Sequence, residues 1–294
     1  MRHAVLGVGG VGGFVGAVLA QGGERVTLLL RPETLAVHPD SLTLESALGG
    51  FTVACARAAR LEEEVDVLWV TPKATQLEAA LALVPEPALA GTVVPLLNGV
   101  DHVARLRARF EATRVVPGTI AAEIERPAPG RIVHRSPFAR FGFSEAGRQA
   151  LDGIEEILTR FGCTVSFERD ELTLLWRKLV MLAPMALATT AAARPLGEVR
   201  ADPAWGPRLE ATAKEASAVG AASGARVNGD EVLGLLRGMP ATLRSSMQKD
   251  VAAGRPPELD AIGGPILRGG RAHGIAVPAT EYLVAEIARL AFSR

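Results

Sequence analysis

Residues 3–31 read HAVLGVGGVGGFVGAVLAQGGERVTLLLR, and this stretch decides the fold. A short apolar run of strand length (His3–Leu6) precedes a glycine-rich turn, an apolar segment of helix length (Gly13–Gln21) and a second strand-like run (Arg25–Leu30). Gly7, Gly9 and Gly12 fit the pattern G-x-G-x-x-G. Because the pattern lies between two strands within about thirty residues, it predicts that a dinucleotide binds at the turn.

Each glycine of the turn has its own physical reason. Gly7 permits the tight turn, Gly9 lets backbone N–H groups approach a pyrophosphate, and Gly12 allows the helix to pack closely on the strand. The positive end of the helix dipole then faces the anion. The expected cofactor-binding residues of this turn are Gly7, Val8, Gly9, Gly10, Val11 and Gly12.

The end of the second strand indicates which dinucleotide binds. Sites for NAD place an acid there for the ribose 2′-hydroxyl, whereas NADP sites use a basic residue for the 2′-phosphate. Arg31 follows this strand, and no acid occurs between Glu24 and Glu33. The pattern therefore favours NADPH, with Arg31 at the 2′-phosphate; the alternative is a solvated arginine at a strand end.

The rest of the chain predicts an α/β fold with two domains. Up to Arg169, apolar strand-like runs alternate with helical segments, and beyond it every pattern is helical. We expect an N-terminal Rossmann-type, doubly wound sheet at 1–169 and an all-helical C-terminal domain at 170–294, with the active site at the carboxyl ends of the parallel strands. The expected elements are strands Val65–Val70, Thr92–Leu96 and Cys163–Phe167, antiparallel additions Ile132–His134 and Ala139–Phe143, and helices Thr75–Leu83 and Glu145–Phe161.

Composition excludes several classes of function. The 32 basic and 32 acidic residues cancel and aromatics make up 4%, which argues against a nucleic-acid partner or a polybasic membrane anchor. The five histidines have no metal-ligand spacing, so we expect no metal site. The isolated Cys55 and Cys163 indicate small buried side chains in a reducing, cytoplasmic compartment. The uncharged run 179–193, which contains Pro184, is expected to be too short to span a bilayer.

Lys178 stands at the beginning of that uncharged run, which we expect to be a helix with Lys178 at its head. The lysine has two interpretations. Its stem could lie along apolar surface while the ammonium reaches water. Alternatively, the lysine is partly desolvated and acts as an acid, because burial lowers a lysine pKa.

Five stretches in order along the chain favour the second interpretation. They are GVGGVGG (7–13), VTPKATQ (70–76), LLNGV (96–100), WRKL (176–179) and SSMQKDVAAGRPPELDAI (245–262). Together they resemble the ketopantoate reductase (2-dehydropantoate 2-reductase) family over nearly the whole chain. The resemblance implies NADPH-dependent reduction of a 2-oxo acid to a 2-hydroxy acid, most simply ketopantoate to pantoate in pantothenate and coenzyme A biosynthesis.

The same resemblance implies roles for individual residues. Lys178 would donate the proton, and Lys73 and Asn98 would lie beside nicotinamide and substrate. Ser246 and Glu258 would hold the polar end of the site, with Glu258 counted among the catalytic residues. Ala122 would match a cofactor-contacting alanine.

Simpler interpretations of these residues stay open. Glu258 could be an acid that favours the dipole in the first turn of a helix. Ser246 could begin a helix, Lys73 could be a surface lysine, and Asn98 could form a turn before Gly99.

The sequence departs from the family at positions where asparagine is usual. Leu182 and Ala186 stand four and eight residues after Lys178, and we expect them to line the same cleft unless that face is simply core. Gly263 replaces another asparagine. The alternatives are therefore a related reductase for a different, less polar 2-oxo acid, or a non-catalytic NADP(H)-binding sensor. A homodimer is compatible with the sequence, which does not fix the oligomeric state.

Overall fold

A computed structural model describes residues 1–292, which form two units. The first unit comprises Met1–Leu97 and His102–Glu171. The second begins at Leu172 and also contains the short segment Asn98–Asp101. The expected division after Arg169 lies two residues before this one, and the assignment of separate cofactor and substrate roles to the two parts stays a prediction.

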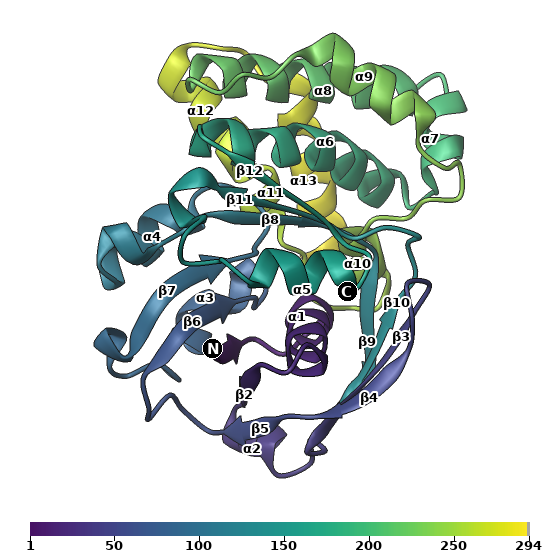
Figure 1. Cartoon of the computed structure of the whole chain (residues 1–294). Helices are drawn as coiled ribbons and strands as arrows, with labels where there is room; N and C mark the ends of the chain where they lie inside the picture. Colours follow the sequence, from purple (N-terminus) through teal and green to yellow (C-terminus); the bar gives the residue numbers. More distant parts are fainter. Residues whose placement is uncertain (293–294) are drawn as a thin grey trace. The chain divides into compact units, whose positions relative to one another are not determined.

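A five-stranded parallel sheet is the centre of the first unit (Figure 1). Its strand order is β5-β2-β1-β6-β7, so the chain reverses direction across the sheet at β1, as a doubly wound fold requires. The strands are β1 (Arg2–Leu6), β2 (Arg25–Leu29), β5 (Ala56–Ala58), β6 (Val65–Val70) and β7 (Ala90–Pro95). The helical segments are α1 (Gly10–Gln21), α2 (Pro32–Leu35), η1 (Ala74–Gln76), α3 (Leu77–Leu81), η2 (Pro87–Leu89), α4 (His102–Arg109) and η3 (Ala112–Arg114). The expected parallel sheet is confirmed.

Two smaller sheets complete the first unit, and most of their strands were not expected. One has the order β4-β3-β10-β9, with β3 (Ser41–Ser46), β4 (Phe51–Ala54), β9 (Ile124–Ala128) and β10 (Arg131–His134). The other has the order β12-β11-β8, with β8 (Gly118–Ala121), β11 (Arg140–Ser144) and β12 (Thr164–Glu168). Strands β10 and β11 each pair antiparallel on one side and parallel on the other, so the antiparallel expectation is half correct.

The expected helix Glu145–Phe161 is wrong over its first half. Only α5 (Ile154–Arg160) is α-helical, preceded by the short η4 (Glu145–Gly147) and turns. Gly153 has φ +80°, a left-handed conformation that interrupts a right-handed helix. Periodic apolar residues before it therefore could not continue into one helix.

All regular secondary structure in the described residues of the second unit is helical, as expected. Its core combines buried aliphatic residues of α6 with those of the helices that follow. The helices are α6 (Glu171–Ala192, whose first residue belongs to the first unit), α7 (Leu196–Ala201), α8 (Trp205–Ala222), α9 (Gly229–Gly238), α10 (Ser246–Ala252), α11 (Leu259–Ile262), α12 (Gly264–His273) and α13 (Pro278–Phe292).

Helix α6 corrects the expectation about membrane spans. Among the helices of residues 1–292, α6 is the one that is long and apolar enough to cross a bilayer. It has 22 residues because it begins well before the uncharged run. However, 67% of its most apolar window is buried inside the protein. That burial is what the core helix of a helical domain shows.

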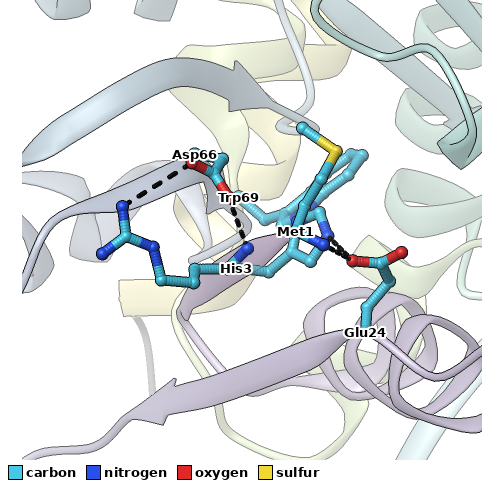
Figure 2. A network of polar contacts seen from close by, with 6 residues as sticks. Met1, His3, Glu24, Asp66 and Trp69 are labelled. Atoms are coloured by element: carbon cyan, nitrogen blue, oxygen red, sulfur yellow. Dashed lines mark hydrogen bonds and ion pairs between the residues drawn. The ribbon is translucent and has the colours of Figure 1, made fainter.

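The beginning of the chain is fixed by a polar network beside β1 (Figure 2). The terminal ammonium group of Met1 pairs with Glu24, and His3 Nε2 lies 3.3 Å from the same carboxylate. The indole N–H of Trp69 on β6 donates to His3 Nδ1 at 3.3 Å. Burial lowers the pKa of His3, against the smaller opposing effect of Glu24. The network thereby joins β1 to β6 and to Glu24, the residue that precedes β2.

Candidate active site

The glycine-rich turn after β1 is shaped by Gly7 and Gly12. Gly7 has φ +91°, and a Cβ atom there would lie 2.4 Å from the backbone nitrogen of Pro72. A Cβ atom on Gly12 would lie 2.3 Å from Thr71 Oγ1. That hydroxyl donates to the carbonyl oxygens of Leu6 at 3.0 Å and Gly7 at 2.8 Å. Thr71, which sequence reasoning missed, therefore holds the turn from the end of β6.

The N-terminus of α1 has the properties of an anion site. Gly9 is its N-cap, no atom lies within 4 Å of the position a Cβ would take there, and no side chain caps the helix. The first turn carries no acid, so the free N–H groups keep their positive field. Gly10 lies against the carbonyl oxygen of Ile124, where a Cβ atom would come within 2.6 Å. Val8 and Val11 pack into the core, so only their backbone could serve a ligand.

Arg31 lies just beyond β2, as the N-cap residue of α2. Its side chain is 64% exposed, and its Nε lies 3.3 Å from Glu33 Oε1. An exposed guanidinium at this place can reach a phosphate, although Glu33 competes for it. The role of Arg31 at the 2′-phosphate stays a prediction.

Lys73 and Ala122 are the other two residues of the first unit that are expected to contact the cofactor. Lys73 is half-buried and is the N-cap residue of η1, directly after the Thr71–Pro72 segment that packs on Gly7. Ala122 is partly buried in the connection between β8 and β9, two residues before Ile124. Their contacts with a cofactor stay predictions.

Asn98 begins the segment of four residues that belongs to the second unit. Its amide nitrogen donates to Glu258 Oε2 at 3.0 Å, a bond between residues 160 positions apart. Gly99 has φ +84°, and a Cβ atom there would lie 2.3 Å from the carbonyl oxygen of Ala261. The segment therefore lies against the chain that carries Glu258, and Asn98 does more than form a turn.

Lys178 is not at the head of its helix, contrary to expectation. Helix α6 begins at Glu171, seven residues earlier, because the segment before Lys178 is helical as well. Burial lowers the pKa of Lys178 from 10.5 to about 8, and the negative charge of Glu258 opposes this by raising it. The side chain is half-buried, so its ammonium is partly desolvated, which favours the interpretation as an acid over that of a solvated surface lysine.

Glu258 is the N-cap residue of α11, and its side chain does not cap the helix. It is 8% exposed, so its carboxylate is held inside the protein by Asn98. Glu258 therefore precedes the first turn of the helix, which Asp260 occupies.

Ser245 is the N-cap residue of α10, and Ser246 is the first residue of the helix. Ser245 is buried and caps α10 by accepting from the backbone nitrogen of Gln248 at 3.1 Å. Its hydroxyl also lies 3.1 Å from Thr189 Oγ1. Ser246 is exposed at the first position of the helix, and its role in substrate binding stays a prediction.

The positions that depart from the family differ in burial. Ala186 is 1% exposed and belongs to the core of the second unit. Leu182 is partly buried and packs against that core. The alternative that this face of α6 is core therefore describes Ala186, and Leu182 is the better candidate for a position near substrate.

Sequence reasoning also missed Gln248 near this region. Its side chain is 5% exposed, and within residues 1–292 neither its amide nitrogen nor its oxygen has a hydrogen-bond partner. The spacing Ser-x-x-Gln from Ser245 would have suggested a capping box, but the glutamine side chain does not form one.

The doubly wound sheet, its glycine-rich turn and the desolvated lysine define a pyridine-nucleotide-dependent oxidoreductase. Family models give the particular family. "Ketopantoate reductase PanE/ApbA" matches residues 3–146, and "Ketopantoate reductase PanE/ApbA C terminal" matches residues 170–291. A 2-dehydropantoate 2-reductase of Caulobacter vibrioides is 32% identical over 292 residues, covering 96% of each chain. The chain belongs to the ketopantoate reductase family.

Solved structures support the same fold. A PanE/ApbA family ketopantoate reductase from Ralstonia eutropha JMP134 matches with a TM-score of 0.88 and 26% identity, covering 100% of this chain and 99% of the other. A ternary structure of D-mandelate dehydrogenase with NADH and anilino(oxo)acetate also has a TM-score of 0.88, at 21% identity and the same coverage. The second likeness shows the fold alone.

Proposed function

We propose that the protein reduces ketopantoate to pantoate with NADPH. The observation that carries this proposal is the arrangement in the second unit: Asn98 donates to the buried Glu258, whose charge acts on the desolvated Lys178. Family membership supplies the reaction class, and these three side chains supply the chemistry for it. Ser246 is proposed to contact the polar end of the substrate, and Glu258 to hold it together with Asn98.

The first unit fits a dinucleotide. The pyrophosphate would lie at the uncapped N-terminus of α1, opposite the open space at Gly9, with Gly10 and the flanking backbone at the turn. Arg31 would contact the 2′-phosphate, Lys73 would lie beside the nicotinamide, and Ala122 would contact the cofactor. When bound, the cofactor supplies a hydride to the ketone carbon of the substrate.

Lys178 performs the acid step. As the carbon–oxygen double bond of the ketone becomes a single bond, its electron pair moves to the oxygen, and the ammonium of Lys178 stabilises the negative charge and donates a proton there. With a pKa of about 8, the lysine is about nine-tenths protonated at pH 7 and yet gives up its proton more readily than an ordinary lysine. The neutral amine then regains a proton from solvent.

Leu182 favours a second candidate, the reductase of a less polar 2-oxo acid. An apolar side chain cannot hydrogen-bond the terminal hydroxyl of ketopantoate, and an apolar pocket rejects analogues only weakly. The fold itself does not limit the choice, since D-mandelate dehydrogenase with this fold binds NADH and an anilino-substituted oxo acid.

The test is oxidation of NADPH, and separately NADH, with a panel of 2-oxo acids. The panel contains ketopantoate, its analogue without the terminal hydroxyl, and phenylglyoxylate. The highest kcat/KM for ketopantoate with NADPH supports the proposal, and a ratio near one between ketopantoate and its deoxy analogue supports the less polar substrate. Tight NADPH binding without turnover of any member would identify a sensor instead. Leu182→Asn should move preference toward ketopantoate, by about 1 kcal/mol for one new hydrogen bond.

A further inference from the structure

The segment Asn98–Asp101 is tied at both ends to the part of the chain around Glu258. At one end, Asn98 donates to the Glu258 carboxylate at 3.0 Å. At the other end, Asp101 pairs with the guanidinium of Arg268 on α12. The segment lies in an irregular connection between β7 and α4. Its order therefore depends on side-chain contacts: these two at its ends, and Val100 between them, which packs against the core of the second unit.

Arg268 joins two carboxylates from different segments. Its Nη2 donates to Asp101, and its Nη1 donates to Asp260 Oδ1 at 2.6 Å. Asp260 is in α11, two residues after Glu258. The rigid planar guanidinium can engage both acids at once, which a single ammonium group cannot reproduce.

Two glycines keep open the space that this bridge needs. A Cβ atom on Gly264 would lie 2.5 Å from Asp260 Oδ1 and 2.6 Å from Arg268 Nη2. A Cβ atom on Gly99 would lie 2.3 Å from the carbonyl oxygen of Ala261. Both the guanidinium and the backbone of the segment therefore approach α11 more closely than other residues would allow.

The bridge contributes order to the site far more than stability to the fold. The side chains of Arg268, Asp101 and Asp260 are 47%, 45% and 72% exposed, and exposed ion pairs stabilise folding little. Fixing a segment that has no regular hydrogen bonding is a different effect, because it limits the positions open to Asn98.

We propose that Arg268 is a positioning residue, which by bridging Asp101 and Asp260 holds the Asn98 amide on the Glu258 carboxylate. The proposal rests on the proposed reductase function for its kinetic consequences. Without the bridge, Asn98 leaves Glu258 part of the time, and the carboxylate no longer keeps one orientation toward Lys178. The substrate then binds in a site that has the same side chains but in poorer alignment.

Arg268→Ala tests the proposal, with Arg237→Ala as the matched control. Arg237 also forms an exposed pair, with Glu210 at 2.9 Å, elsewhere in the second unit; the two side chains are 66% and 45% exposed. We expect Arg268→Ala to lower kcat/KM about tenfold, mainly through kcat, and Arg268→Lys to recover only part of this. Asp101→Asn, which keeps the shape of the side chain, should cause a similar loss that is not additive with Arg268→Ala. Activity of Arg268→Ala within twofold of the Arg237→Ala control overturns the proposal.

A second measurement does not need turnover. The titration of the Lys178 side chain can be followed by NMR in wild type, Arg268→Ala and Asp101→Asn. Since the fixed charge of Glu258 raises the pKa of Lys178, loosening it should lower that pKa by about half a unit or more in both variants. An unchanged titration overturns the positioning role even where activity falls, because a general structural defect would explain the loss. If the titration shifts but the wild-type protein reduces no 2-oxo acid, the positioning role of Arg268 is supported and the proposed function is refuted.

Discussion

The exchange Glu258→Gln isolates the electrostatic effect of the Glu258 carboxylate on Lys178. Glutamine keeps the size of the side chain and an amide oxygen that can still accept from Asn98, whose bond to Glu258 is 3.0 Å long. The change therefore removes the negative charge and preserves the local packing. Because that charge raises the pKa of Lys178, the pKa should fall below its wild-type value of about 8.

The size of the shift follows from the surroundings of the pair. A nearby opposite charge in a partly buried site typically moves a pKa by about one to three units. With the smallest of these shifts, the lysine pKa drops to about 7. The protonated fraction at pH 8 then falls from about one half to about one-tenth, and at pH 7 from about nine-tenths to about one half.

The assay is the pH dependence of kcat/KM, which reports the ionisation of the free enzyme. Lys178 must be protonated to act as the acid, so activity is full below its pKa and is lost as pH rises through it. Wild type should show an alkaline limb near pH 8, and Glu258→Gln a limb at least about one unit lower. Lys178→Ala is the control: it should lose about 10²–10⁴-fold in turnover and the limb itself, with NADPH binding intact. A limb that stays in place or moves upward in Glu258→Gln would refute the assignment of Lys178 as the acid.

Arg31, Lys178 and His3 each allow a further test by substitution. Arg31→Ala should weaken NADPH binding by about 1.5–3 kcal/mol and leave NADH binding unchanged, whereas Glu33→Gln should tighten NADPH binding by releasing the arginine. Calorimetric titration with both cofactors measures these changes, and equal wild-type affinities for NADPH and NADH would contradict the role of Arg31. Lys178→Met should raise the free energy of unfolding at pH 7 by up to about 3 kcal/mol, because the lowered pKa of the lysine reflects the cost of burying its charge. In denaturant titrations this gain should shrink above pH 8 and vanish beyond pH 10.5. Burial lowers the pKa of His3 in the folded state, so the unfolded chain is protonated first and the free energy of unfolding should fall as pH drops below about 6.5. His3→Gln should flatten this pH dependence, and an unchanged slope in the variant would contradict the role of His3.

Four strands of the parallel sheet, β1, β2, β6 and β7, were predictable because they are largely buried on both faces, whereas the mostly exposed edge strand β5 was missed. Strand β6 has the expected bounds, Val65–Val70, and β1 and β2 differ from expectation by one residue, since continuous apolar runs between turn residues leave little choice. Strands such as β3 (Ser41–Ser46) and β4 (Phe51–Ala54) were missed. Each exposes part of its surface, so neither gives a long apolar run, and their pairing depends on partners far along the chain.

The candidate site shows the same limit. The lysine and the glutamate could be singled out from the sequence, but a residue such as Arg268 could not, because its significance lies in contacts with Asp101, 167 positions away, and Asp260. The start of α6 was misplaced since the helix does not begin where the apolar run begins. Burial separated Ala186 from Leu182, which the helical spacing alone treats alike.

The parts of the site in the second unit differ in how they are held, and this indicates where substitutions should matter. Lys178 projects from the middle of a 22-residue helix, whose packing fixes its backbone regardless of local changes. Asn98 and Glu258 come from short connections, and their alignment depends on a few contacts around Gly99 and Arg268. Lys178 can act as the acid only when the Glu258 carboxylate is aligned with it. The alignment of the site therefore depends on the connections that carry Asn98 and Glu258, and not on helix α6. Residues that never touch substrate there should therefore affect turnover more than exposed residues of α6 that lie nearer to Lys178 in the chain.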